Sequence, residues 1–129
     1  MLGKTEAIYL TAQIRLIEQA AVDENPRIQL MERAGEAAAD IARGLLGENA
    51  TSVLVLAGPG NNGGDAYVVA RHLKRWWYHV DVVSLGDPKR LEGDAANAYT
   101  MFQEAGGTIS ESIPADKRYD LVIDGLFGI

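Results

Sequence analysis

The chain has 129 residues, with 12 Lys or Arg, 18 Asp or Glu, and no Cys. This length suits one domain or a piece of one, and 47% hydrophobic residues are enough to bury a core. A formal charge of -6 without a basic run argues against nucleic acid as a partner. The absence of Cys excludes disulfides and thiolate metal sites within the chain.

The first third of the chain predicts two amphipathic helices. Apolar residues recur at helical spacing over residues 11–21 and 28–46, and Asn25-Pro26 separates the two runs. The inward face of the second helix is expected to carry Leu30, Ala34, Ala37, Ile41 and Leu45. Charged residues among the first twenty argue against a signal peptide or a membrane span, so we expect a soluble cytoplasmic protein.

Strands and helices alternate through the rest of the chain. Apolar runs predict strands at 53–57, 80–85, 108–109 and 120–124, with helices at 65–76 and 92–105. This order predicts an α/β fold with a parallel sheet and right-handed crossovers. Ligands of such sheets bind outside the carboxyl ends of the strands, where both glycine-rich loops of this chain fall.

A glycine-rich turn follows the first of these strands. Gly58, Gly60 and Gly63 match G-x-G-x-x-G between a strand and a helix, which is the context that the dinucleotide fingerprint requires. Glycine permits positive φ and close approach to a ligand, and free amides at a helix start can hold a phosphate. The alternative is a tight turn that needs glycine for geometry alone. No Gly-Lys-Ser or Gly-Lys-Thr follows, which excludes a Walker A loop.

The polar side chains of this turn leave several interpretations open. An ordinary dinucleotide site needs an acidic residue near the end of the second strand to hold a ribose, and Asp87 stands there. That interpretation does not account for Asn61, Asn62 and Asp65. Asp65 suits either the cap of the following helix or a ligand contact. The two Asn residues add oxygens that can coordinate a hard cation.

Three segments carry a resemblance to a known family. They read Ala-Gly-Pro-Gly-Asn-Asn-Gly-Gly-Asp-Ala-Tyr-Val-Val-Ala-Arg-His-Leu at 57–73, Leu-Met-Glu-Arg-Ala-Gly at 30–35 and Val-Ile-Asp-Gly-Leu-Phe-Gly at 122–128. In this order they resemble the YjeF N-terminal domain family, the NAD(P)HX (NAD(P)H-hydrate) epimerases. The resemblance covers nearly the whole chain.

The resemblance implies an architecture and an activity. It implies a Rossmann-like three-layer α/β/α domain over residues 1–129, with a mostly parallel sheet and two leading N-terminal helices. Family members continue to an Asp-Ile-Pro-Ser-Gly segment, so the domain is expected to be truncated at its C-terminal side. The implied enzyme is an isomerase that interconverts the R and S forms of hydrated NADH and NADPH at C6 for cofactor repair. A homodimer and a companion dehydratase domain or partner are also implied.

By the same resemblance, particular residues acquire roles. The residues that would contact the substrate are Asn61, Asn62, Gly63, Gly64, Asp65 and Gly128. Asn62 and Asp124 would help to hold a potassium ion, a hard cation suited to oxygen ligands. Asp124 is also the candidate catalytic acid, because a carboxylate at the end of a buried strand is partly desolvated and gains proton affinity. Its alternative role is to cap the next turn.

Two other classes of function stay open. The fold can serve as a non-catalytic module that binds a nucleotide or a protein, and an NAD-linked dehydrogenase ranks third. The retained amide pair and carboxylates favour the enzyme. His72 and His79 are expected to lack a partner, and packing is favoured over a stacking surface for Trp76-Trp77-Tyr78.

Overall fold

A computed structural model describes residues 30–127, so the first predicted helix lies outside the described part of the chain. The elements in chain order are α2 (Leu30–Leu46), β1 (Ser52–Ala57), α3 (Asn61–Arg75), β2 (His79–Ser84), η1 (Pro88–Arg90), α4 (Gly93–Glu104), β3 (Ile109–Ser110) and β4 (Leu121–Gly125). Apart from the short 3-10 helix η1, the predicted order of strands and helices is confirmed for this part.

The sheet has the order β3-β2-β1-β4, and all three strand pairs are parallel. The expected α/β class and parallel sheet are therefore confirmed. Successive strands β1, β2 and β3 extend to one side, and the chain then returns to place β4 on the other side of β1. The strand order thus reverses at β1, and the crevice between the carboxyl ends of β1 and β4 is where an open α/β sheet binds its ligand.

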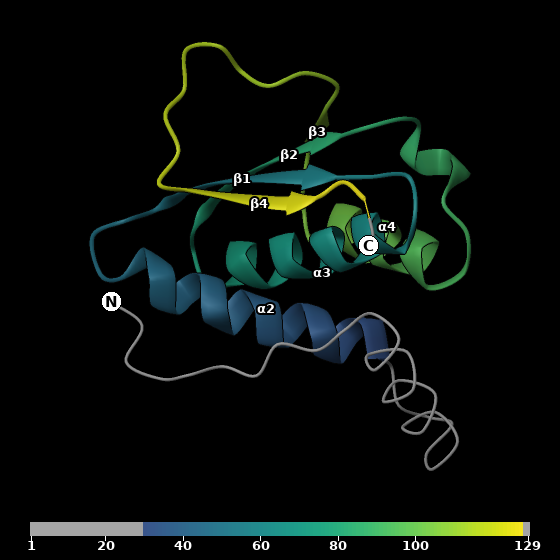
Figure 1. Cartoon of the computed structure of the whole chain (residues 1–129), viewed down its shortest axis with the longest axis horizontal. Helices are drawn as coiled ribbons and strands as arrows, with labels where there is room; N and C mark the ends of the chain where they lie inside the picture. Colours follow the sequence, from purple (N-terminus) through teal and green to yellow (C-terminus); the bar gives the residue numbers. More distant parts are fainter. Residues whose placement is uncertain (1–29, 128–129) are drawn as a thin grey trace. The chain divides into compact units, whose positions relative to one another are not determined.

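Helices α2, α3 and α4 lie on one side of the sheet (Figure 1). The apolar side chains of β1 and β2 that face them, Val53, Val55 and Val82, are buried with at most 1% exposure. Tyr67 and Phe102 complete this core from α3 and α4. No helix within residues 30–127 covers the other face of the sheet, where the resemblance implies a further layer.

The connection from β3 to β4 passes over the other side of the sheet (Figure 1), as a right-handed return crossover requires. Asp81 of β2 accepts hydrogen bonds from Tyr119 Oη at 2.7 Å and Lys117 Nζ at 3.0 Å. Burial and the bond to Asp81 raise the pKa of Tyr119 to about 12. Asp120 accepts bonds from the amides of Thr51 and Ser52 at 2.9 and 3.0 Å. Asp81 and Lys117, whose scatter in the sequence suggests solvated surface, thus join Asp120 in fastening the connection to the strands.

Helix α2 buries a different face from the predicted one. Its buried residues are Gly35, Ala39, Ala42 and Leu46, whereas Ile41 and Leu45 of the predicted face are 63% and 58% exposed. Gly35 decides the face, because a Cβ at this position would collide with the Val68 side chain of α3. Apolar residues recur at helical spacing on both sides of α2, so periodicity alone could not select the correct side.

The aromatic run after α3 divides between core and solvent. Trp76 and Tyr78 pack against the core, and the Arg43 guanidinium lies 4.1 Å from the centre of the Trp76 ring. Trp77 has a φ of 71° and is 90% exposed. The packing interpretation is therefore confirmed for Trp76 and Tyr78 and is wrong for Trp77. None of the helices within residues 30–127 is both long and apolar enough to cross a lipid bilayer.

Candidate functional site

Helix α3 begins four residues earlier than predicted, at Asn61 instead of Asp65. Gly60 is its N-cap, with extended backbone and no side-chain cap, and the Gly64 amide donates to the Gly60 carbonyl at 3.3 Å. Asn61 and Asn62 therefore stand in the first turn, and Asp65 is too far along the helix for the predicted cap. The first amides of a helix have no acceptor inside it, so the Asn61 end of α3 offers donors to an anion.

The glycines after β1 serve close packing rather than unusual backbone angles. A Cβ at Gly63 would collide with the Gly58 carbonyl, and one at Gly64 would lie 2.8 Å from Cα of Ala95 on α4. None of the glycines at 58, 60, 63 and 64 has positive φ, so that expectation was wrong. Of these four, only Gly60 has open space where a Cβ would stand. The geometric alternative thus accounts for three of the four glycines, and Gly60 remains accessible to a ligand.

The ends of β1 and β4 meet beside the start of α3. The amide of Gly58 donates to the Gly125 carbonyl at 2.8 Å, which extends the ladder between the two strands. A Cβ at Gly125 would lie 2.9 Å from the main-chain oxygen of Asn62 and 2.7 Å from Cβ of Ala66. Asp124 immediately precedes this contact. The fold therefore brings the backbones at Asn62 and Asp124 to the same edge of the sheet, at the point where the strand order reverses.

The side chain of Asp124 is exposed, contrary to the predicted desolvation. The reason is that β4 is an edge strand of the described sheet, in which Val122 is 53% exposed and burial alternates along the strand. Asp124 Oδ1 accepts the amide of Leu126 at 3.0 Å. This bond is the turn cap that the sequence offered as the alternative role. The second carboxylate oxygen has no hydrogen bond to residues 30–127 and is available to a ligand.

The polar residues of the 61–65 block differ in exposure. Asn61 is exposed, and Asn62 and Asp65 are half-buried. Gly63 and Gly64 are buried, so only their main-chain atoms can serve a ligand. Gly128, the remaining predicted contact, lies outside the described residues.

The donor set at this edge fits a hard cation. Asn62 has no side-chain hydrogen bond within the described residues, and Asp124 keeps one carboxylate oxygen. The side-chain oxygen of Asn62 and the remaining carboxylate oxygen of Asp124 are ligands of the kind that bind hard, weakly held ions. No cluster of three or more His, Cys, Asp or Glu residues between positions 30 and 127 is arranged to hold a metal. The chemistry therefore agrees with potassium better than with zinc.

The helical side of the sheet holds a partly buried ionic cluster that no sequence pattern indicates. Glu32 of α2 forms an ion pair with Arg71 Nη2, and its Oε1 lies 2.9 Å from Nε2 of His72. Arg71 is 6% exposed and also points Nη1 at Met101 Sδ, 3.2 Å away on α4. The prediction that His72 lacks a partner was wrong, because its partner is 40 residues away in sequence. No spacing signal within one helix can reveal such a contact.

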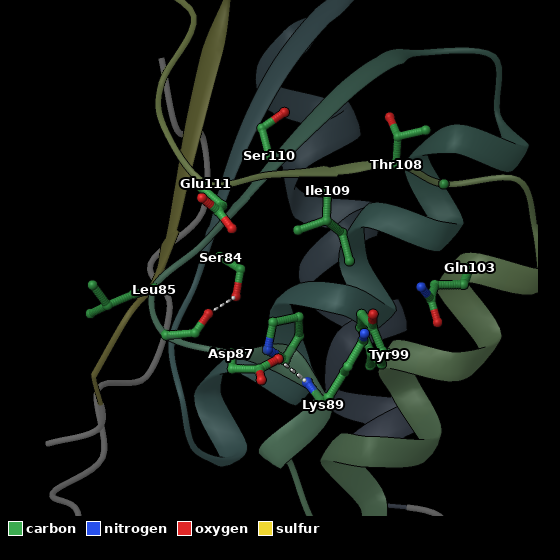
Figure 2. Close-up of a pocket in the computed structure, with 13 residues that line it drawn as sticks. Ser84, Leu85, Asp87, Lys89, Tyr99, Gln103, Thr108, Ile109, Ser110 and Glu111 are labelled. Carbon is green, nitrogen blue, oxygen red and sulfur yellow. Dashed lines mark hydrogen bonds between the residues drawn. The ribbon is translucent and has the colours of Figure 1, made fainter.

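Two cavities continue the carboxyl edge of the sheet away from Asp124. The smaller, of about 300 Å³, is lined by Pro59, Gly60, Asn61, Arg90, Leu91, Glu92 and Ala95. The larger, of about 950 Å³, lies between the ends of β2 and β3, η1 and α4 (Figure 2). Asp87, the acidic residue expected near the second strand, lines the larger cavity. Arg90 in the smaller one was not predicted, because η1 itself was not.

Sequence comparison adds named relatives. A family model described as YjeF-related protein N-terminus matches residues 27–129. The NAD(P)H-hydrate epimerase of Bordetella pertussis (strain Tohama I) is 48% identical over 117 residues, which cover 91% of this chain and 50% of that protein. The Bifunctional NAD(P)H-hydrate repair enzyme of Leishmania major is 41% identical over 117 residues, covering 84% of this chain and 20% of that protein.

Structural comparison agrees with the sequence comparison. The crystal structure of yeast ynu0 matches with a TM-score of 0.73 and 25% sequence identity, over 95% of this chain and 57% of that one. The chain spans about half the length of the Bordetella relatives that it matches. With the family model covering most of its residues, the chain belongs to the YjeF-related protein N-terminus family.

Proposed function

We propose that the protein containing this chain is an isomerase that interconverts the R and S forms of hydrated NADH and NADPH at C6. The observation that carries the proposal is the close approach of Gly125 to the main chain of Asn62, which brings the backbone of the segment 124–125 to the first turn of α3. It is supported by 48% identity to a protein named NAD(P)H-hydrate epimerase.

The substrate's phosphates would bind at the start of α3. Main-chain amides of the 61–63 turn point out of the helix end and favour negative charge. The side chains of Asn61 and Asn62 would add hydrogen bonds, and Asp65 and Gly128 would contribute the further contacts that the resemblance implies. Arg90 lines the cavity beside Asn61 and would supply a positive charge from η1.

Asp124 is the proposed acid. C6 of the hydrated ring carries a hydroxyl, and protonation lets this group leave as water, so that water added to the opposite face yields the other epimer. In the free protein the carboxylate of Asp124 is exposed, and water around an exposed carboxylate stabilises its charged form. A bound substrate would remove water from around Asp124 and so raise its proton affinity where the proton is needed.

Potassium is the proposed ion, held by Asn62 and Asp124. When bound it would supply a fixed positive charge close to the substrate's phosphates. A carboxylate shared with a cation holds a proton less readily, so the two roles of Asp124 compete. Asn62 would bind the ion and the substrate but would not transfer a proton. Its substitution therefore changes the potassium dependence of the reaction without removing the proposed acid.

The wider biology is proposed from the family. The name of the Leishmania relative includes the word bifunctional, which supports a second repair activity, expected to be a dehydratase, in the same chain or a partner. We also propose a homodimer working in the cytoplasm, without a nucleic acid partner.

The test is an epimerase assay on the full-length protein. R-NADHX is mixed with the protein, and the S epimer is followed by chromatography with and without potassium. Acceleration over the uncatalysed rate, greater with potassium, is the expected result. No acceleration under either condition contradicts the proposal and favours the non-catalytic binding module.

A further inference from the structure

The larger cavity lies on the same edge of the sheet as the candidate site. Its volume of about 950 Å³ is in the range of small-molecule sites. The 3-10 helix η1 stands between it and the smaller cavity beside Asn61, with Lys89 facing the first and Arg90 the second. A dinucleotide whose phosphates lie at the start of α3 has its two ends on opposite sides of that point, and one of these sides is the larger cavity.

Two carboxylates line this cavity from different elements. Asp87 Oδ1 accepts the amide of Lys89 at 2.9 Å and caps η1, which leaves its second oxygen available. Glu111 enters from the beginning of the β3–β4 connection and directs its carboxylate toward the space in Figure 2. Lys89 is the single cationic side chain of the lining. The net charge of the lining is therefore negative, which suits the hydroxyls of a sugar and disfavours a phosphate.

The opposite wall has the composition of a base-binding surface. Tyr99 of α4 and Ile109 of β3 offer flat and apolar contact, and Gln103 offers both a donor and an acceptor. Figure 2 shows Ile109 between Glu111 and Gln103. The Tyr99 ring is held by an edge contact with the fully buried Tyr67, at 5.4 Å between ring centres and 68° between planes. This support makes Tyr99 a rigid platform for a planar base.

The polar capacity of this region exceeds what the chain uses. The hydroxyl of Tyr67 is buried without a hydrogen-bond partner among the described residues. The Tyr67 ring contacts Tyr99, which lines the cavity. Ser84 also lines the cavity, and its hydroxyl donates to the Gly86 carbonyl at 3.1 Å. The Ser84 oxygen can still accept a hydrogen bond, so it offers an acceptor to a hydroxyl of a ligand.

We propose that this cavity binds the adenosine end of the hydrated dinucleotide and favours a free ribose 2'-hydroxyl over a 2'-phosphate. The proposal rests on the proposed function and extends it to substrate choice between hydrated NADH and hydrated NADPH. Asp87 and Glu111 accept hydrogen bonds from the ribose hydroxyls, while the base lies against Tyr99. A 2'-phosphate brings nearly two negative charges to the same carboxylates and is repelled.

Binding of ADP-ribose and of its 2'-phosphorylated form to the full-length protein tests this proposal. Isothermal titration calorimetry is expected to give at least about tenfold tighter binding for ADP-ribose, in line with hydrogen bonds to charged groups. Asp87→Asn and Glu111→Gln are each expected to weaken ADP-ribose binding about fivefold or more and to reduce the discrimination. Asn retains the capacity to cap η1, so the first variant keeps its fold.

Matched controls remove exposed carboxylates elsewhere. The two control variants are Asp116→Asn and Glu104→Gln. Asp116 belongs to the same connection as Glu111, and Glu104 is the last residue of α4. Neither residue lines the cavity. Both are expected to bind ADP-ribose as the wild type does. Absent binding of ADP-ribose, equal or tighter binding of the phosphorylated form, or unchanged binding by both cavity variants overturns the proposal. ADP-ribose lacks the hydrated ring, so these outcomes are independent of the epimerase assay, whose failure alone would overturn the proposed activity.

Discussion

The single hydrogen bond from the Leu126 amide to Asp124 Oδ1 determines how the candidate acid can act. It holds the carboxylate against the turn that follows β4 and leaves one oxygen free. The Asp124 side chain is exposed, so a ligand can reach this oxygen from solvent.

Replacing Asp124 by Asn in the full-length enzyme is expected to lower kcat for epimerisation by about a hundredfold or more, the usual contribution of general acid catalysis. An Asn side chain can still accept the Leu126 amide, so the fold and the binding of substrate should persist. Chromatography of the epimers gives the rate. An unchanged rate, with potassium binding retained, would show that Asp124 is not the acid.

Glycine positions in the 58–64 turn are expected to differ sharply in tolerance. Gly63→Ala places a Cβ against the Gly58 carbonyl and should destabilise the fold by about 1–3 kcal/mol, because backbone cannot move aside cheaply. Gly60→Ser is the matched control, since Gly60 has open space and Ser is a good N-cap. Urea unfolding measures the free energy of unfolding of both variants. Equal stability of the two variants would contradict the packing account of Gly63.

Elements, more than single residues, explain which sequence signals succeeded. Strand β1 and the order of alternating strands and helices followed from apolar runs and turns. The buried face of α2 did not, because Ala and Gly residues pack inward while Ile41 and Leu45 remain exposed. The start of α3 was misplaced because Gly63 and Gly64 look like turn residues, although α4 and the Gly58 carbonyl require their small size inside a helix.

The Glu32 cluster joins α2 to α3 and α4, and removal of its carboxylate should loosen all three. Glu32→Ala leaves the buried Arg71 without its ionic partner and is expected to lower the free energy of unfolding by about 3 kcal/mol. Glu36→Ala, an exposed position on the same helix, should change it by less than about 0.5 kcal/mol. A loss at Glu32 no larger than at Glu36 would mean that the cluster does not hold the helices together.

The β3–β4 connection should make stability depend on acid pH. Amide bonds from Ser52 and Thr51 hold the pKa of Asp120 below its ordinary 3.8, and the Tyr119 hydroxyl acts in the same direction on Asp81. A lowered folded-state pKa gives stability that is present above the ordinary value and lost as pH falls through the lowered one. Urea unfolding at about pH 6 and about pH 3 should therefore show a smaller acid loss in Asp120→Asn than in the wild type. An identical acid loss would remove Asp120 from this account.

At the scale of the whole molecule, the reversal of strand order at β1 creates the candidate site. The motifs suggest residues 61–65 and 124 as candidate site residues, and the rule for parallel sheets predicts the edge at which their backbones meet. The exposure of Asp124 could not be predicted from the sequence, because it depends on β4 being an edge strand of the described sheet. The larger cavity could not be predicted either, since it is formed by η1, α4 and β3 together.

A double-mutant cycle between Asn62→Ala and Asp124→Asn in the full-length protein, read out as kcat/KM for epimerisation, tests whether the two side chains serve one site. If the two side chains serve one site, the effect of the double variant should differ from the sum of the single effects by at least about 0.5 kcal/mol. Additive effects, within about 0.3 kcal/mol, would mean that Asn62 and Asp124 act apart and that the site proposed at the junction of β1, β4 and α3 does not exist.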